Sequence, residues 1–220
     1  MKTILAPSVL SANLTNLKSD IDETISSGAE YIHFDVMDGM FVPNISFGIP
    51  VLESISKNTN ALVDTHLMID KPERYILDFS EKGSSIITFH IEATSDALGC
   101  AKMIRSLGKK AGISIKPKTS PEVLFSLIDT DAIDMILVMS VEPGFGGQSF
   151  IEDSLDKISI IKDYIEKNNK EIDIEVDGGI NKDNVKSVLD AGANIIVAGS
   201  SIFKGNIKKN TTEMLKAMGL

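Results

Sequence analysis

The sequence has little of several features that mark particular classes of protein. It contains one cysteine, Cys100, so no disulfide bond can form within the chain. Its longest weakly polar run, residues 191–203, is far shorter than the roughly 20 apolar residues needed to cross a bilayer. Residues 1–11 hold one lysine and a very short apolar run, unlike a secretory signal. We therefore expect a soluble, cytoplasmic protein without a membrane partner.

Basic residues are also few. The 22 lysines and arginines are outnumbered by 31 aspartates and glutamates, which gives a formal net charge of −9 and a pI near 4.8. No run of the chain concentrates positive charge, so nucleic acid is not an expected partner. The composition is even from end to end, and no linker rich in proline, glycine or serine divides it. We expect a single domain over residues 1–220.

Short apolar runs alternate with amphipathic, helix-like stretches along the whole chain. Strands that alternate with helices predict parallel βα units, and eight units in 220 residues predict a (β/α)8 TIM barrel of the α/β class. An open doubly wound sheet is the alternative. The even spacing, and the lack of GxGxxG after the first run, favour the barrel. The runs occupy residues 4–10, 31–37, 61–69, 85–92, 111–117, 135–141, 172–178 and 194–200.

Three of these runs carry polar side chains on one face. Side chains alternate along a strand, so His33 and Asp35 share a face. His66 and Asp177 stand at matching places in the third and seventh runs. All four lie near the C-terminal ends of their runs, where barrel enzymes place their chemistry. Two imidazoles and two carboxylates at one point predict a site for a divalent metal. The alternative is that these residues only satisfy one another by hydrogen bonds.

Other side chains stand at the same strand ends. The third histidine, His90, ends the fourth run, and we expect it to have a structural or supporting role. Met37, Met68 and Met139 lie at or near the ends of their runs. They are candidates for an apolar lining that keeps water from a reactive intermediate, with ordinary core packing as the alternative.

Glycine-rich segments follow the last three runs. They are "EPGFGGQSF" (142–150), "DGGIN" (177–181) and "AGSSIF" (198–203), and none contains lysine or arginine. Barrel enzymes often bind phosphate with the loops after strands seven and eight. Glycines let backbone N–H groups approach phosphate oxygens closely. We expect a phosphate site built from backbone N–H groups and from Ser200 or Ser201, with simple tight turns as the alternative.

At this point a family resemblance becomes clear. The stretches "PSVLSANL", "HFDVMDGMFVPNISFG", "DTHLMIDKPERYI", "VMSVEPGFGGQSFI", "IEVDGGIN" and "VAGSSIF" together closely resemble the ribulose-phosphate 3-epimerase family, from about residue 5 to residue 203. Two departures are minor: Asn13 stands where aspartate is common, and Lys118 stands where a small residue is usual. We expect neither to touch the chemistry.

The resemblance implies a role for each matching position. His33, Asp35, His66 and Asp177 resemble the metal ligands, and Asp35 and Asp177 resemble the acid–base pair. Ser8 and His66 would contact the sugar, and Asp177 would also face it. The residues that would hold the phosphate are Gly144, Phe145, Gly146, Gly147, Gly178, Gly179, Gly199 and Ser200.

The implied reaction interconverts D-ribulose 5-phosphate and D-xylulose 5-phosphate in the pentose phosphate pathway. Inverting carbon 3 removes a proton next to the carbonyl and returns one to the opposite face, so two carboxylates are needed. The intermediate is an enediolate, whose charge a divalent metal would stabilise. We expect one zinc ion, with iron, manganese or cobalt as alternatives. The partner is a phosphorylated ketopentose, and the family resemblance implies a homo-oligomer.

Three other functions remain open at this stage. A close relative, allulose-6-phosphate 3-epimerase, shares the framework but tends to vary the glycines that here read "GFGGQ" and "DGG". A barrel of the thiamine-phosphate-synthase type shares the glycine-rich rim but does not require the His/Asp set. A non-catalytic barrel would bind a phosphosugar without exchanging its C3 proton. Residues 41–48, "FVPNISFG", are a candidate lid or interface, because they place Phe41 and Phe47 in a loop expected to be exposed, with local packing as the alternative.

Overall fold

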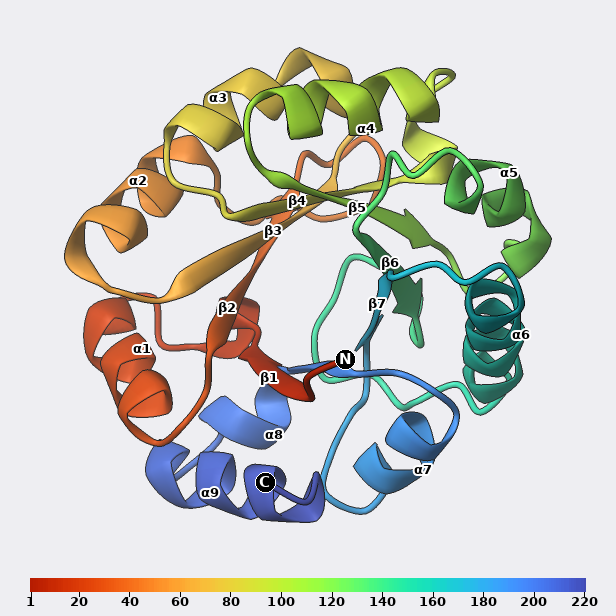
Figure 1. Cartoon of the computed structure of the whole chain (residues 1–220). Coiled ribbons are helices and arrows are strands. Elements are labelled where there is room, and N and C mark those ends of the chain that lie inside the picture. Colours follow the sequence, from red (N-terminus) through yellow and green to blue (C-terminus); the bar gives the residue numbers. More distant parts are fainter.

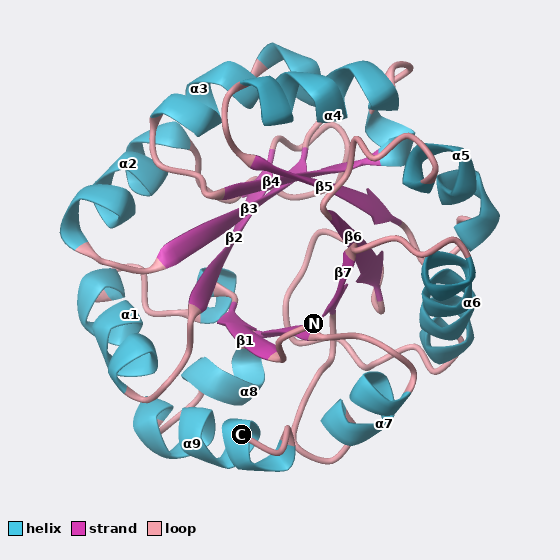
Figure 2. Cartoon of the chain, viewed as in Figure 1, coloured by secondary structure: helices cyan, strands magenta, loops and turns pink.

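The computed structural model describes residues 1–220 and contains eight strands that alternate with helices. In Figure 1 the helices form a ring around the strands, and Figure 2 shows the same separation by type of element. The strands are β1 (Ile4–Pro7), β2 (Tyr31–Met37), β3 (Leu62–Met68), β4 (Ile86–His90), β5 (Lys110–Ile115), β6 (Met135–Met139), β7 (Asp173–Asp177) and β8 (Ile195–Ala198).

Each strand is followed by at least one helix. The α-helices are α1 (Leu17–Ser26), α2 (Ile49–Asn58), α3 (Ile76–Glu81), α4 (Ala97–Ser106), α5 (Phe125–Ile128), α6 (Ser154–Lys167), α7 (Val185–Asp190), α8 (Ser200–Phe203) and α9 (Ile207–Ala217). Short 3₁₀ turns occupy Val9–Ser11, Pro72–Arg74, Ile91–Ala93 and Pro121–Leu124. None of the helices combines the length and the apolar composition that crossing a bilayer requires.

The strands form one parallel sheet that curls into a barrel. Its order is β1-β8-β7-β6-β5-β4-β3-β2, and every neighbouring pair is parallel. The two ends of this series meet through a parallel bridge between Ser8, just after β1, and His33 on β2. The sheet therefore closes on itself. The predicted (β/α)8 barrel is confirmed, and the open doubly wound sheet is wrong.

The two faces of the sheet differ as the alternation predicted. Outward-facing residues such as Ile32, Phe34 and Val36 belong to the large apolar core between the strands and the helices. Inside the barrel, the N-terminal end is filled by a separate apolar layer. This layer consists of Ile4, Ala6, Tyr31, Ile86, Met135, Ile195 and Val197. Because apolar residues fill that end, the polar inward residues gather further along the strands, toward their C-terminal ends.

Candidate active site

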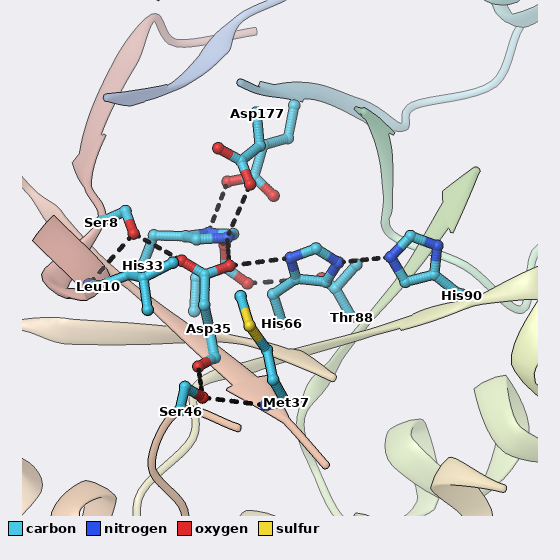
Figure 3. Close-up of polar contacts among 12 residues, drawn as sticks. Ser8, Leu10, His33, Asp35, Met37, Ser46, His66, Thr88, His90 and Asp177 are labelled. Carbon is cyan, nitrogen blue, oxygen red and sulfur yellow. Dashed lines mark hydrogen bonds and ion pairs between the residues drawn. The ribbon is translucent and has the colours of Figure 1, made fainter. Parts of the chain in front are cut away.

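The four residues predicted to bind a metal meet at the C-terminal mouth of the barrel. His33 and Asp35 come from β2, His66 from β3 and Asp177 from β7, and Figure 3 shows their side chains turned toward one another. One potential ligand atom from each lies within 4.8 Å of all the others. His66 Nδ1 is 3.1 Å from Asp35 Oδ1, and His33 Nε2 is 3.8 Å from Asp177 Oδ2.

Local backbone contacts hold Asp35 in place. Parallel pairing sets Asp35 beside His66 in the register of β2 and β3. The Ser46 hydroxyl, from the loop after β2, donates to the backbone carbonyl of Asp35 at 2.6 Å and accepts from the N–H of Met37 at 3.0 Å. The Ser8 hydroxyl donates to Asp35 Oδ2 at 2.5 Å. Ser46 therefore holds the backbone at Asp35, and Ser8 holds its carboxylate (Figure 3).

His33 is buried with one ring nitrogen unpaired. Its Nδ1 lies 2.7 Å from Asp64 Oδ2, but its Nε2 has no hydrogen-bond partner. Asp35 Oδ1 is 3.3 Å from that nitrogen, without the geometry of a hydrogen bond. Hydrogen bonds among the four residues therefore do not account for the site, because an unpaired buried nitrogen is costly. Two imidazole nitrogens and two carboxylates that share one point fit a divalent cation.

A second polar layer lies below the four residues. Asp64 and Glu175 face His33 on the inner side, and Glu175 Oε1 is 3.5 Å from His33 Nδ1. Both are fully buried, and burial raises the pKa of the Glu175 carboxyl well above its usual range. Sequence reasoning assigned these two residues no role. Alternation along β3 and β7 places each of them two positions before a predicted ligand, and this is the signal that could have found them.

The electrostatics of the two proposed acid–base residues differ strongly. Burial raises the pKa of Asp35, but the nearby charge of His33 and the hydrogen bond with His66 outweigh it and hold that pKa well below its usual range. Burial and the negative charge of Asp35 raise the pKa of Asp177 to about 6. One carboxyl is therefore ionised at neutral pH, while the other can hold a proton close to neutrality. Two carboxyls whose pKa values differ in this way can serve one as the base and the other as the acid.

His90 lies directly behind His66. Its Nε2 is 2.9 Å from the Nε2 of His66, and its Nδ1 is 3.2 Å from Oε2 of Glu92 (Figure 3 shows the two rings). Burial lowers the pKa of His90 to about 4. Burial raises the pKa of Glu92, but hydrogen bonds from His90, from the Lys116 N–H and from Thr119 lower it to about 2. Sequence reasoning did not identify Glu92, which lies in a turn.

One hollow connects the two aspartates to the glycine-rich loops. No lysine or arginine lines it. The sequence-predicted residues in its wall are Ser8, Asp35, Met37, Met68, Met139, Gly144, Phe145, Gly146, Gly147, Asp177, Gly178, Gly179, Gly199 and Ser200. His33 and His66 do not line it, because they lie fully buried beneath. Ser11 and Gln148 also line it and were not predicted.

The glycine-rich loops approach one another too closely for side chains. Gly178 and Gly179 have φ of +126° and +67°, and a Cβ on Gly179 would lie 2.4 Å from the backbone nitrogen of Phe150. The Ser201 hydroxyl donates to the carbonyl of Ile180 at 2.7 Å and does not line the hollow. Of the two candidate serines, only Ser200 therefore faces the site.

The loop of residues 41–48 packs more closely than expected. The loop was expected to be exposed, and it includes the exposed residues Pro43 and Ile45, but its Phe41 and Phe47 are half-buried. The ring centroids of Phe41 and His90 are 4.8 Å apart, and those of Phe47 and Phe34 are 4.6 Å apart. The Asn44 side chain donates to the carbonyl of Gly144 at 2.7 Å, which ties this loop to the glycine-rich loop after β6.

Comparison with known proteins decides the family. The sequence model of the ribulose-phosphate 3 epimerase family matches residues 4–203. The chain belongs to the ribulose-phosphate 3-epimerase family. The ribulose-phosphate 3-epimerase of Eremothecium gossypii is 40% identical over 227 residues, covering 98% of this chain and 92% of the relative. That of Bacillus subtilis is 40% identical over 213 residues, covering 96% and 97%. The expected enzyme class, an isomerase that acts as an epimerase, is confirmed.

A solved structure with low sequence identity has the same fold. The 3-keto-L-gulonate-6-phosphate decarboxylase of Vibrio cholerae superposes with a TM-score of 0.74 at 14% identity, over 99% of this chain and 97% of that one. At such identity the likeness concerns the barrel alone, and function depends on the site that each sequence builds on it. In this ribulose-phosphate 3-epimerase family member, the candidate for that site is the His/Asp cluster with the glycine-rich rim.

Proposed function

We propose that this chain interconverts D-ribulose 5-phosphate and D-xylulose 5-phosphate. The observation that carries the proposal is the meeting of Asp35 and Asp177 in one hollow with the glycine-rich loops. The aspartates come from strands β2 and β7, which are not neighbours in the barrel. A substrate between them can be reached by one carboxylate on each face. The names of the relatives, which are ribulose-phosphate 3-epimerases, support the choice of substrate.

The chemistry follows from the two different carboxyls. The ionised one removes the proton from carbon 3, which is acidified by the neighbouring carbonyl. The protonated one returns a proton to the opposite face of the planar enediolate, and this inverts the centre. For the reverse reaction the two exchange roles. Positioned acid–base groups of this kind typically contribute about 10²–10⁴-fold in rate. The Ser8 hydroxyl donates a hydrogen bond to Asp35 and orients that carboxylate toward the hollow.

We propose that His33, Asp35, His66 and Asp177 hold one divalent metal ion. The supporting observation is the unpaired Nε2 of His33, buried beside carboxylate oxygens of Asp35 and Asp177. This donor set suits zinc best and also accepts Fe²⁺, Mn²⁺ or Co²⁺. When bound, the ion would act as a Lewis acid that stabilises negative charge on the substrate oxygens. His33 and His66 would serve as ligands only, because neither lines the hollow.

The phosphate would bind at the other end of the hollow. Gly144, Gly146 and Gly147 line one side, and Gly178, Gly179, Gly199 and Ser200 line the other. With no basic side chain in the wall, backbone N–H groups and the Ser200 hydroxyl would provide the hydrogen bonds. Met37, Met68 and Met139 would cover the apolar side of the sugar and exclude water.

The test compares two substrates with the same protein. We expect kcat/KM for D-ribulose 5-phosphate to exceed that for D-allulose 6-phosphate by at least about tenfold, since the glycine pattern has the ribulose-phosphate form. A reversed ratio would replace the proposed substrate with the ketohexose phosphate. Binding of both sugars without turnover of either would overturn the catalytic proposal and leave a phosphosugar sensor.

A further inference from the structure

We propose that the hydroxyl of Ser11 donates a hydrogen bond to the phosphate of the substrate. Ser11 ends the 3₁₀ turn Val9–Ser11 that follows β1, and sequence reasoning gave it no role. The inference deepens the proposed phosphate site and rests on it, because it adds a side chain to an end of the hollow where backbone N–H groups and the Ser200 hydroxyl are the other donors.

Ser11 lies between the two sides of the glycine-rich rim. A Cβ on Gly199, just after β8, would lie 2.6 Å from Ser11 Oγ. A Cβ on Gly146, in the loop after β6, would lie 3.4 Å from the same oxygen. All three residues line the hollow. The Ser11 hydroxyl therefore stands where loops from two different strands approach each other, which is the place proposed for the phosphate.

The glycine at position 199 keeps this place open for the hydroxyl. Gly199 has a φ of −98°, so it is not among the glycines that a left-handed backbone requires. A side chain there would meet Ser11 Oγ first, at 2.6 Å, whereas the next atoms, the Cβ of Ser11 and the Cβ of Ser8, lie 3.4 and 3.8 Å away. The space that a side chain would take is thus the space that the Ser11 hydroxyl occupies.

The Ser11 hydroxyl is free to meet a ligand. Two other serines near the hollow use their hydroxyls within the protein, since Ser8 donates to a carboxylate and Ser201 to a backbone carbonyl. Ser11 and Ser200 line the hollow, and their hydroxyls form no hydrogen bond within the chain. Ser11 is half-buried and Ser200 is exposed, so the Ser11 hydroxyl is the more shielded of the two donors. A hydrogen bond shielded from water is electrostatically stronger.

Phosphate is the ligand group that suits this position. A hydrogen bond from a neutral donor to a charged oxygen is stronger than one between neutral groups. No lysine or arginine lines the hollow, and the chain carries a net charge of −9, so a bound anion depends on such donors. Ser8, at the start of the same turn, contacts Asp35 instead. The two serines of this segment thus serve different ends of the hollow, Ser8 the proposed acid–base group and Ser11 the phosphate.

The first test is Ser11→Ala, which removes the hydroxyl and keeps Cβ. We expect KM for D-ribulose 5-phosphate to rise by about 10–100-fold, as for the loss of a hydrogen bond to a charged group. We expect kcat to stay within about threefold of the wild type, because the phosphate takes no part in the proton transfer. The matched control is Ser187→Ala, at an exposed position on α7, which should change neither constant. An unchanged KM in Ser11→Ala would overturn the proposal.

Urea unfolding shows whether the hydroxyl supports the fold instead. Since the Ser11 hydroxyl has no partner in the chain, we expect the free energy of unfolding of ligand-free Ser11→Ala to equal that of the wild type. A lower stability together with a lower kcat would overturn the proposal, because the hydroxyl would then hold the loops in place.

Binding of inorganic phosphate separates the role of Ser11 from the identity of the sugar. Backbone ¹H–¹⁵N spectra recorded during a phosphate titration give Kd without turnover. Ser11→Ala should bind phosphate about 10–100-fold more weakly than the wild type, and Ser187→Ala should bind it equally well. Equal Kd values for Ser11→Ala and wild type would overturn the proposal. If the wild type does not turn over D-ribulose 5-phosphate, the proposed function fails, while the phosphate titration still decides the role of Ser11.

Discussion

The Nδ1 atom of His33 lies 2.7 Å from Oδ2 of Asp64, and this contact turns the opposite nitrogen, Nε2, toward Asp35 and Asp177. The other proposed histidine ligand is turned the opposite way. His66 faces the cluster with Nδ1 and contacts His90 with Nε2. The two ligands thus use different nitrogens, and each is oriented by an inner polar neighbour.

Asp64→Asn should weaken metal binding. The amide can still accept from His33 at its oxygen, but it lacks the charge that makes His33 a stronger ligand, so we expect about tenfold lower zinc affinity. Chelator competition measures this. Asp22→Asn, an exposed residue paired with Lys18 on α1, is the control and should bind zinc as the wild type does. Unchanged affinity in Asp64→Asn would show that the buried contact does not orient His33 for a metal.

Asp35→Asn and Asp177→Asn should each lower kcat by about 10²–10⁴-fold, because each removes one of the two groups that move the proton. Metal content must be measured in the same samples, since both residues are also proposed ligands. Asp183→Asn, at an exposed position just beyond the glycine-rich loop, should leave kcat unchanged. Turnover near the wild-type rate in either site variant, with normal metal content, would contradict the two-base route.

Gly179→Ala should impair phosphate binding. Its Cβ would lie 2.4 Å from the backbone nitrogen of Phe150, so the loop must move away from the hollow. We expect KM for the sugar phosphate to rise by about tenfold or more, which corresponds to ~1.4 kcal/mol. Gly205→Ala is the control, because it has a similar positive φ of +91° but open space around it. It should cost about 1–3 kcal/mol of stability and leave KM unchanged. A similar KM in the two variants would place the phosphate elsewhere.

Glu92 should make folding stability dependent on pH in the acid range. Its pKa falls from an ordinary value of 4.5 to about 2 in the folded state, since its hydrogen bonds outweigh burial. A depressed pKa stabilises the folded protein above about pH 4.5, and that contribution is lost as the pH falls toward 2. We expect metal-free wild type to exceed Glu92→Gln by about 1–2 kcal/mol at neutral pH, allowing for partial exposure.

Urea unfolding from pH 7 down to acid pH measures that difference in the free energy of unfolding. The gap between wild type and Glu92→Gln should close as the pH drops, because a protonated Glu92 resembles glutamine. A gap that does not change with pH would mean that the carboxylate charge contributes nothing to stability.

The sequence predicted those parts of the site that depend on strand periodicity. Alternation along β2 placed His33 and Asp35 inside the barrel, and the parallel register brought Asp35 beside His66. Strand periodicity predicts side-chain directions within strands, but it predicts nothing about side chains in turns. Glu92 and Ser11 lie in 3₁₀ turns, and Gln148 lies in an irregular segment, so no period predicts where their side chains point.

Tertiary packing accounts for the other difference. Phe41 and Phe47 looked exposed because loops usually are. Phe41 instead packs against His90, and Phe47 packs against Phe34. These contacts depend on how the loop packs against β2 and β4, and the local pattern of residues 41–48 does not contain them.

The central claim is a metal-assisted proton transfer by two carboxylates, and one measurement tests it most directly. D-ribulose 5-phosphate is turned over in D₂O before and after chelator treatment, with metal analysis of the same samples. We predict that deuterium enters carbon 3 of the product, that turnover is lost with the metal, and that adding zinc or cobalt restores it. Epimerisation that survives complete metal removal, or a product without deuterium at carbon 3, would contradict the account.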